Sequence, residues 1–93
     1  MERNKKLETL GYSIQHTNYS SSIRYETMCY EKYFNEKGVC LVKQIYQDYH
    51  GCWVGDLSIR YCKITSLEKI QIINQAWEEL QEDIKRANEN KND

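Results

Sequence analysis

Long apolar segments and a strong charge of one sign are both missing from this chain of 93 residues. No run approaches the ~20 apolar residues of a membrane-spanning helix, and the N-terminus, MERNKKLETL, lacks the apolar core of a signal peptide. The net charge of −1 argues against non-specific binding to nucleic acid or to an anionic membrane. We therefore expect a cytoplasmic protein with no membrane partner.

Proline is absent and alanine is rare, whereas Lys, Asn, Ile and Tyr are abundant. This bias is typical of an AT-rich genome and carries no structural signal. Hydrophobic residues make up 40% of the chain, which is below the average for globular domains, but aromatic residues contribute 12% and supply bulk for a core. A chain of this length can bury one modest core, so we expect one domain over residues 1–93.

Motifs of catalysis and metal binding are also missing. There is no nucleophile elbow, phosphate-binding loop or HExxH motif. Structural zinc sites usually take cysteines in close-spaced pairs, whereas Cys29, Cys40, Cys52 and Cys62 are widely separated. We predict no catalytic residue, no metal and no cofactor, with reduced cysteines acting as small hydrophobic side chains. A zinc site formed by these thiolates and His50 is the alternative.

The remaining pattern predicts a helix, several strands and a longer helix. Residues 2–10 predict a short helix that ends at Gly11 in the left-handed conformation. Concentrations of β-branched and aromatic residues predict strands over 12–15, 23–34, 39–49 and 57–64. Polar or glycine-containing loops separate them at 16–22, 35–38 and 50–56. Thr65 to Glu68 fits a capping box for the last helix, and residues 88–93 are expected to fray.

A four-residue turn over 35–38 would fix the register of the strands on either side. Phe34 would then face Val39, and Tyr30 would face Lys43. The expected core face holds Met28, Tyr30, Phe34, Val39, Leu41 and Ile45, together with Lys32 and Lys43. The opposite face holds Cys29, Tyr33, Cys40, Val42 and Tyr46. That face is unusually apolar for a solvated surface, so we expect the N-terminal helix or a partner to cover it.

Residues 65–87 show the clearest helical periodicity. Large apolar residues recur at steps of three and four, at Leu67, Ile70, Ile73, Trp77, Leu80, Ile84 and then Ala87. We expect this stripe to pack on the sheet, next to Leu57, Ile59 and Tyr61 on one face of the last strand. The predicted fold class is α+β: an antiparallel sheet of three to four strands packed by a long C-terminal helix, with a short N-terminal helix.

The opposite side of this helix is acidic. Its carboxylates form like-charge i, i+4 pairs, which weaken an isolated helix slightly, and they are Glu78, Glu79, Glu82 and Asp83. A solvated surface is the ordinary explanation. The functional explanation is attraction to an Arg- and Lys-rich groove, such as one that holds nucleic acid. We predict these four acids as partner-binding residues, with Tyr33 and Tyr46 on the sheet as a second surface.

The segments LETLGY and ITSLEKIQIINQAWEEL resemble the corresponding parts of small accessory proteins of phages and prophages. Some small acidic proteins of this class inhibit host defence, including anti-CRISPR proteins that occupy the nucleic-acid-binding grooves of nucleases. The resemblance implies a non-enzymatic protein–protein interaction module. It also implies a phage-encoded inhibitor that binds a host nucleic-acid enzyme in the host cytoplasm.

Two alternatives use other surfaces. The first is a small nucleic-acid-binding or regulatory protein, in which tyrosines and lysines on the sheet stack on and hold single-stranded nucleic acid. Acidic residues dilute the cations, so we expect direct nucleic-acid binding less than protein binding. The alternation of three and four in the helical stripe also suits a coiled-coil seam, which would give a homodimer.

Overall fold

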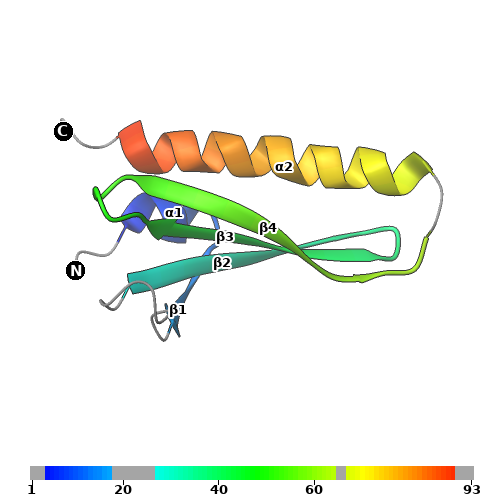
Figure 1. Ribbon diagram of the computed structural model, residues 1–93, viewed down its shortest axis with the longest axis horizontal. Coiled ribbons are helices and arrows are strands. Elements are labelled where there is room, and N and C mark those ends of the chain that lie inside the picture. Colours follow the sequence, from blue (N-terminus) through cyan, green and yellow to red (C-terminus); the bar gives the residue numbers. More distant parts are fainter. Residues whose placement is uncertain (1–3, 18–26, 65–66, 90–93) are drawn as a thin grey trace.

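The computed structural model describes residues 4–17, 27–64 and 67–89. Its elements are, in chain order, α1 (Lys5–Thr9), β1 (Ser13–Thr17), β2 (Thr27–Glu36), β3 (Val39–Gln47), β4 (Trp53–Cys62) and α2 (Leu67–Asn88). The strands form one antiparallel sheet in the order β1-β2-β3-β4, and α2 runs along one face of it (Figure 1). The predicted α+β fold is confirmed. The predicted capping residue Thr65 lies outside the described residues.

Both ends of α1 follow from its sequence. Asn4 caps the helix, because its side-chain oxygen accepts a hydrogen bond from the Leu7 backbone N–H at 3.1 Å. Gly11 has φ of +97°, and the N–H of Tyr12 donates to the carbonyl of Leu7 at 3.0 Å. This is a Schellman motif, as the glycine predicts. It places Leu7 and Tyr12 together in the core.

The predicted register between β2 and β3 is wrong by two residues. The turn has two residues, Lys37 and Gly38, and both have positive φ, as a type I′ hairpin requires. Phe34 therefore pairs with Leu41 instead of Val39, and Tyr30 pairs with Ile45 instead of Lys43. Side chains alternate with a period of two, so this shift leaves each residue on its predicted face.

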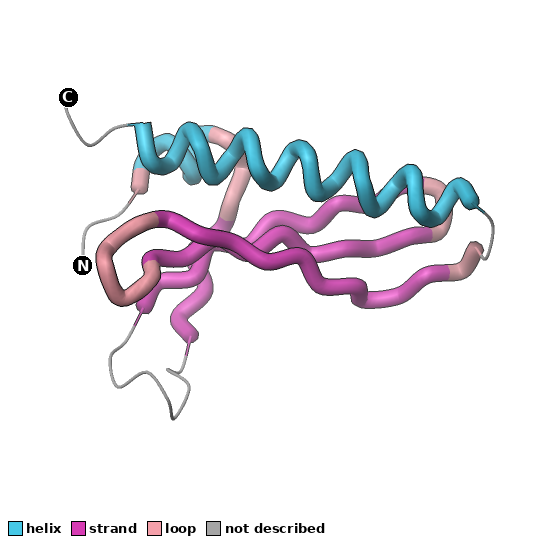
Figure 2. Tube along the Cα trace, turned by 45° about the horizontal axis from the view of Figure 1, so that its top comes forward, coloured by secondary structure: helices cyan, strands magenta, loops and turns pink. Residues whose placement is uncertain are grey.

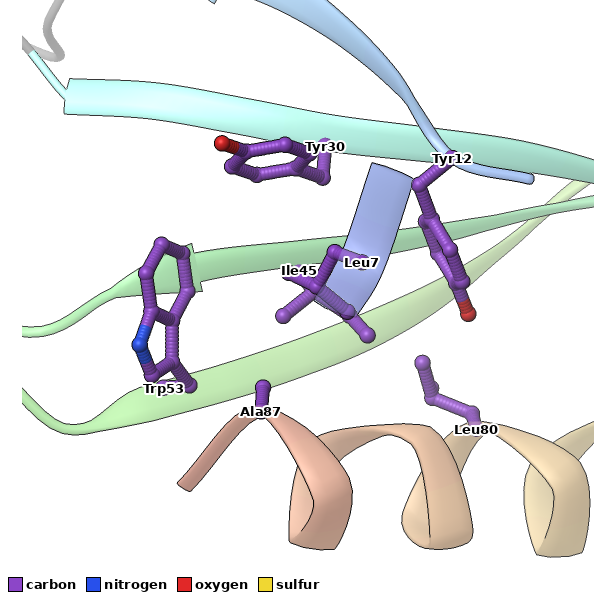
Figure 3. Close-up of a cluster of buried hydrophobic side chains, with 7 residues drawn as sticks. All are labelled: Leu7, Tyr12, Tyr30, Ile45, Trp53, Leu80 and Ala87. Carbon is purple, nitrogen blue, oxygen red and sulfur yellow. The ribbon is translucent and has the colours of Figure 1, made fainter. Parts of the chain in front are cut away.

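One face of the sheet carries the core. A first cluster consists of Leu7, Tyr12, Tyr30, Ile45, Trp53, Leu80 and Ala87 (Figure 3), and a second of Val39, Leu41, Ile72 and Ala76. The rings of Tyr30 and Trp53 meet edge to face at 5.7 Å. Since Leu7 lies in the same cluster as Leu80, α1 and α2 share one side of the sheet (Figure 2). The expectation that the N-terminal helix covers the other face is wrong.

The predicted helical stripe is wrong at three of its seven positions, whereas Ile73, Leu80, Ile84 and Ala87 contact the core clusters as predicted. Leu67, Ile70 and Trp77 are exposed, while Ile72 and Ala76 are buried against the sheet. The predicted stripe contains mainly large apolar residues, whereas the contact with the sheet uses a small one. Ala76 is fully buried and lets the helix lie close to the strands. Gly55 on β4 has the same effect, because a Cβ there would meet the Gln44 carbonyl oxygen at 2.6 Å and Ile84 at 3.0 Å.

A β-bulge changes the faces of β4. Leu41 pairs with Ile59 and Cys40 with Tyr61, so β4 has one extra residue at this point. Ile59 shares the face of Leu41 beneath α2, while Tyr61 shares the opposite face with Cys40. The prediction that Ile59 and Tyr61 lie on one face is therefore wrong. Strand β4 also begins earlier than predicted, at Trp53.

Candidate functional site

The four predicted carboxylates of α2 lie along one flank of the helix, the flank turned toward β3 and Tyr12. We call this the charged flank, consisting of Glu78, Glu79, Glu82 and Asp83. All four line a groove of about 350 Å³ with Leu10, Lys32, Lys43 and Arg86. The acids are therefore not on a uniformly acidic outer surface, because the groove that they border also contains three cationic side chains.

Two of the acids are engaged inside the protein. The Nζ atom of Lys43 lies 3.1 Å from a Glu79 carboxylate oxygen and 3.8 Å from Asp83. The Lys43 side chain is only 2% exposed and Asp83 is 15% exposed. Within the described residues, Lys43 is the one buried charged residue, and these two carboxylates compensate its charge. Lys43, which the sequence pattern placed on the core face, thus accounts for two of the four acids, Glu79 and Asp83.

Tyr12 completes this network from the end of α1. Its hydroxyl donates a hydrogen bond to Asp83 at 2.7 Å. Burial, and then the hydrogen bond to Asp83, raise the pKa of Tyr12 far above its ordinary value. The phenol therefore remains a neutral donor at physiological pH. The network of Tyr12, Asp83, Lys43 and Glu79 fixes the rotation of α2 about its axis.

Lys32, the second lysine predicted on the core face, has a comparable role. Its Nζ atom donates to the carbonyl of Leu10 at 2.7 Å, just after α1, and lies 5.8 Å from the centre of the Tyr12 ring. Both lysines on this face therefore hold helices to the sheet.

The other two acids, Glu78 and Glu82, are exposed, and Glu79 is 46% exposed despite its bond to Lys43. Glu79 also accepts a hydrogen bond from Gln75 at 3.3 Å. Of the four predicted partner-binding acids, three therefore present carboxylate to solvent. Asp83 is mainly a structural residue.

The predicted tyrosine surface lies on the face opposite α2, but its two members differ. Tyr33 is exposed, whereas the Tyr46 hydroxyl donates to Asp56 at 2.8 Å. That hydrogen bond, followed by burial, raises the pKa of Tyr46 to about 12. The sequence analysis missed Tyr61, which is half exposed and has the Lys63 Nζ atom 5.5 Å from its ring centre. The bulge that moved Tyr61 to this face has no clear sequence signal.

The most conspicuous exposed surface is one that the sequence analysis assigned to the core. Leu67 is 77% exposed and Trp77 is 46% exposed, and Ile70 lies between them on the same side of α2. At about 100° per residue, these three positions fall within roughly 80° of one another around the helix. Ile59, on the neighbouring edge strand β4, is also half exposed. We call these four residues the apolar flank.

The cysteines are spread over three strands and the β3–β4 turn. The four form no disulfide with one another, and Cys29 and Cys40 are buried. Burial raises the pKa of the Cys29 thiol to about 11, which disfavours the reactive thiolate. Over residues 4–17, 27–64 and 67–89, no three His, Cys, Asp or Glu side chains converge as metal ligands would. In the same ranges no helix has the length and apolarity needed to cross a membrane.

No family model, curated protein or solved structure matches the chain.

Proposed function

We propose that this protein is a non-enzymatic protein–protein interaction module that binds through the exposed sides of α2. The observation that carries the proposal is the apolar flank: three large apolar side chains of one helix are exposed beside a fourth on β4. Contiguous exposed apolar residues with a charged rim are typical of interaction sites. Trp77 is the natural anchor, because tryptophan is enriched among residues that dominate binding energy.

Photo-crosslinking tests this proposal directly. A photoreactive amino acid at position 77 should form adducts in living cells. The same group at Tyr49 is the control, since that side chain is 82% exposed but lies in the β3–β4 turn. Adducts at both positions, or at neither, would remove the apolar flank as the specific contact.

Within this class, we propose the narrower role of a phage-encoded inhibitor that binds a basic groove of a host nucleic-acid enzyme. The support is the exposed carboxylate of the charged flank, at Glu78, Glu79 and Glu82. Carboxylates beside an apolar anchor can steer a helix toward a basic surface and make association fast and sensitive to salt. Asp83 is excluded from this role, because Tyr12 and Lys43 already engage it.

The assay for this role is inhibition of purified RNA-guided host nucleases at several salt concentrations. The variant Glu78→Gln/Glu82→Gln should lose inhibition by about tenfold or more. Glu36→Gln/Glu68→Gln changes the net charge equally but lies near the β2–β3 turn, and it should retain inhibition. Equal loss in both variants would show a dependence on net charge alone.

A second candidate is nucleic-acid binding on the face opposite α2. It is favoured by the exposed rings of Tyr33 and Tyr61 and by the stacking of Lys63 on Tyr61. An electrophoretic shift assay with single-stranded DNA and RNA at low salt separates the candidates. A shift that Tyr33→Ala/Tyr61→Ala abolishes would favour this second function, and no shift would remove it.

A further inference from the structure

We infer that the outer edge of β4 binds an extended segment of the partner protein, which adds a strand to the four-stranded sheet beside the apolar flank. This inference rests on the proposed use of α2 as an interaction surface and names the kind of partner segment that fits there. Three features of the described residues carry it: the direction of the backbone groups of β4, the position of Trp77 relative to the strand, and the charge of Asp56.

The hydrogen bonds of Asn88 show which backbone groups of β4 point away from the sheet. Its side-chain amide accepts a hydrogen bond from the Trp53 N–H at 2.9 Å and donates one to the Trp53 carbonyl at 3.0 Å. A residue of a neighbouring strand makes the same pair of bonds, so Asn88 takes the place of a strand at this one residue. The outward direction recurs at every second residue of a strand, so the N–H and carbonyl groups of Gly55, Leu57 and Ile59 also point outward.

This edge of the sheet is open beyond Trp53. Strand β4 is the last in the order β1-β2-β3-β4, and α2 runs along a face of the sheet, not along this edge (Figure 1). In the described part of the chain, the outward backbone groups from Gly55 to Ile59 therefore face no other strand. Such a row of donors and acceptors is a template for an extended chain, which forms main-chain hydrogen bonds with it.

Trp77 lies at the level of the open part of this edge. From the end where Asn88 binds the strand, β4 and α2 run in opposite directions (Figure 1). At ~3.3 Å per strand residue and ~1.5 Å per helix residue, Trp77 lies at about the level of Ser58. The same measure places Gly55 at the level of Ile84, in agreement with the 3.0 Å that would separate a Cβ on Gly55 from Ile84.

The rotation of α2 places the apolar flank on the side of this edge. Glu79 reaches Lys43 on β3, and Trp77 lies ~160° away from Glu79 around the helix, on the side turned away from β3. Trp77 and Ile70 are exposed there, and Ile59 on β4 is half exposed. Alternate side chains of an added strand would face these three residues. The segment that fits is therefore apolar at every second position.

The remaining side chains of the segment would lie on the face opposite α2, beside Asp56. Side chains alternate along β4, so Asp56 and Ser58 point to that face, where they pair with Gln44 and Val42 of β3. Asp56 is exposed, and its carboxylate accepts a hydrogen bond from the Tyr46 hydroxyl at 2.8 Å. Opposite charges on adjacent strands stabilise their pairing. The segment that fits therefore has a Lys or Arg beside Asp56, between two apolar residues.

Selection of random nine-residue peptides, displayed on yeast, against the full chain tests this pattern. Enriched peptides should be apolar at every second position, with a basic residue between two apolar ones. Selection against Asp56→Lys should replace that base by an acid, because the charge beside it is reversed. Absence of enrichment, or apolar residues at steps of three and four as in a helix, would overturn the inference.

Proline on the edge tests the backbone contacts. Ile59→Pro removes an outward N–H that takes no part in the β3–β4 ladder, and proline is tolerated on edge strands. It should weaken binding of an enriched peptide about tenfold, as measured by fluorescence anisotropy. Ile59→Val keeps the N–H and should weaken binding less than about threefold. Equal effects of the two variants would contradict a backbone contact.

Methylated peptides make the same test without altering the protein, should circular dichroism show that Ile59→Pro does not fold. Methyl groups on every second backbone nitrogen of the enriched peptide can be placed in two alternating sets. One set blocks the N–H groups that face β4 and should abolish binding, while the other blocks N–H groups that face solvent and should preserve it. Equal affinities of the two methylated peptides would overturn the inference.

Photo-crosslinking separates this inference from the proposed function. Adducts at position 77 that a folded Ile59→Pro protein forms in undiminished yield would reject strand addition and leave the interaction module in place. Absence of adducts at position 77 would remove the module itself. A dimer of the unmodified chain in sedimentation equilibrium that Ile59→Pro dissociates would show that a second copy, and not a partner segment, occupies the edge.

Discussion

The two flanks of α2 differ in what the rest of the chain does with them. On the charged flank, a buried lysine and a tyrosine hydroxyl engage Glu79 and Asp83. On the apolar flank, Leu67, Ile70 and Trp77 lie outside the part of α2 that faces the sheet and remain exposed. The flank that appeared functional in the sequence is partly structural. The flank that appeared structural has the properties of a binding surface.

This comparison shows that the chemical type of a residue is a poor guide to its role in a small domain. A buried cation needs carboxylate partners, because an unpaired charge in a core is costly. Apolar residues of a helix that do not face the sheet remain in solvent. The free energy of folding should therefore depend strongly on the network of Tyr12, Lys43, Glu79 and Asp83 and weakly on the apolar flank. The affinity for a partner should depend strongly on the apolar flank and weakly on that network.

The largest effect on stability is expected from Lys43→Met. Loss of the ammonium leaves Asp83 and Glu79 without their cation, and we expect the free energy of unfolding to fall by about 2–3 kcal/mol. The matched control is Lys37→Met, since Lys37 forms an exposed ion pair with Glu68 at 3.4 Å. It should change stability by less than about 0.5 kcal/mol. Urea denaturation followed by circular dichroism measures both, and equal effects would contradict a special role for Lys43.

A smaller effect is expected from Tyr12→Phe, which removes the hydroxyl bonded to Asp83. We expect a loss of about 1 kcal/mol at neutral pH. The raised pKa of Tyr12 also predicts a pH dependence. The phenol stays protonated in the folded protein while it ionises near pH 10 in the unfolded chain, so the stability of the unmodified protein should decline as pH rises above 10.

Denaturant titrations between pH 9 and pH 11 test this dependence. Tyr12→Phe should show a shallower decline, because it lacks the linked proton. The tyrosine Tyr46, whose pKa is also raised, contributes a decline to both proteins, and Tyr46→Phe serves as the comparison. Parallel curves for the unmodified protein and Tyr12→Phe would show that Tyr12 is not the linked group.

Much of the fold could be predicted because its signals are local. The Gly11 helix end, the Lys37–Gly38 turn region and the periodicity of α2 all depend on short segments. The register was wrong by two residues because the sequence does not state the length of the turn, yet the core faces survived because a shift of two preserves side-chain alternation.

The candidate site was less predictable because it depends on tertiary contacts. The rotation of α2 follows from the small residues Ala76 and Gly55 at the contact with the sheet and from the length of Lys43, which reaches two carboxylates. The bulge in β4 moved Tyr61 to the opposite face. The position of Lys43 on the core face was the one available signal, because a buried cation needs carboxylate partners, and here these are Glu79 and Asp83.

The smallest effect on folding is expected from Leu67→Ser on the apolar flank. This side chain is largely exposed, so its loss should change the stability of the monomer by less than about 0.5 kcal/mol. Urea denaturation followed by circular dichroism compares the two proteins at one protein concentration. A loss of more than about 1 kcal/mol would show that Leu67 contributes to the core, as the sequence pattern predicts.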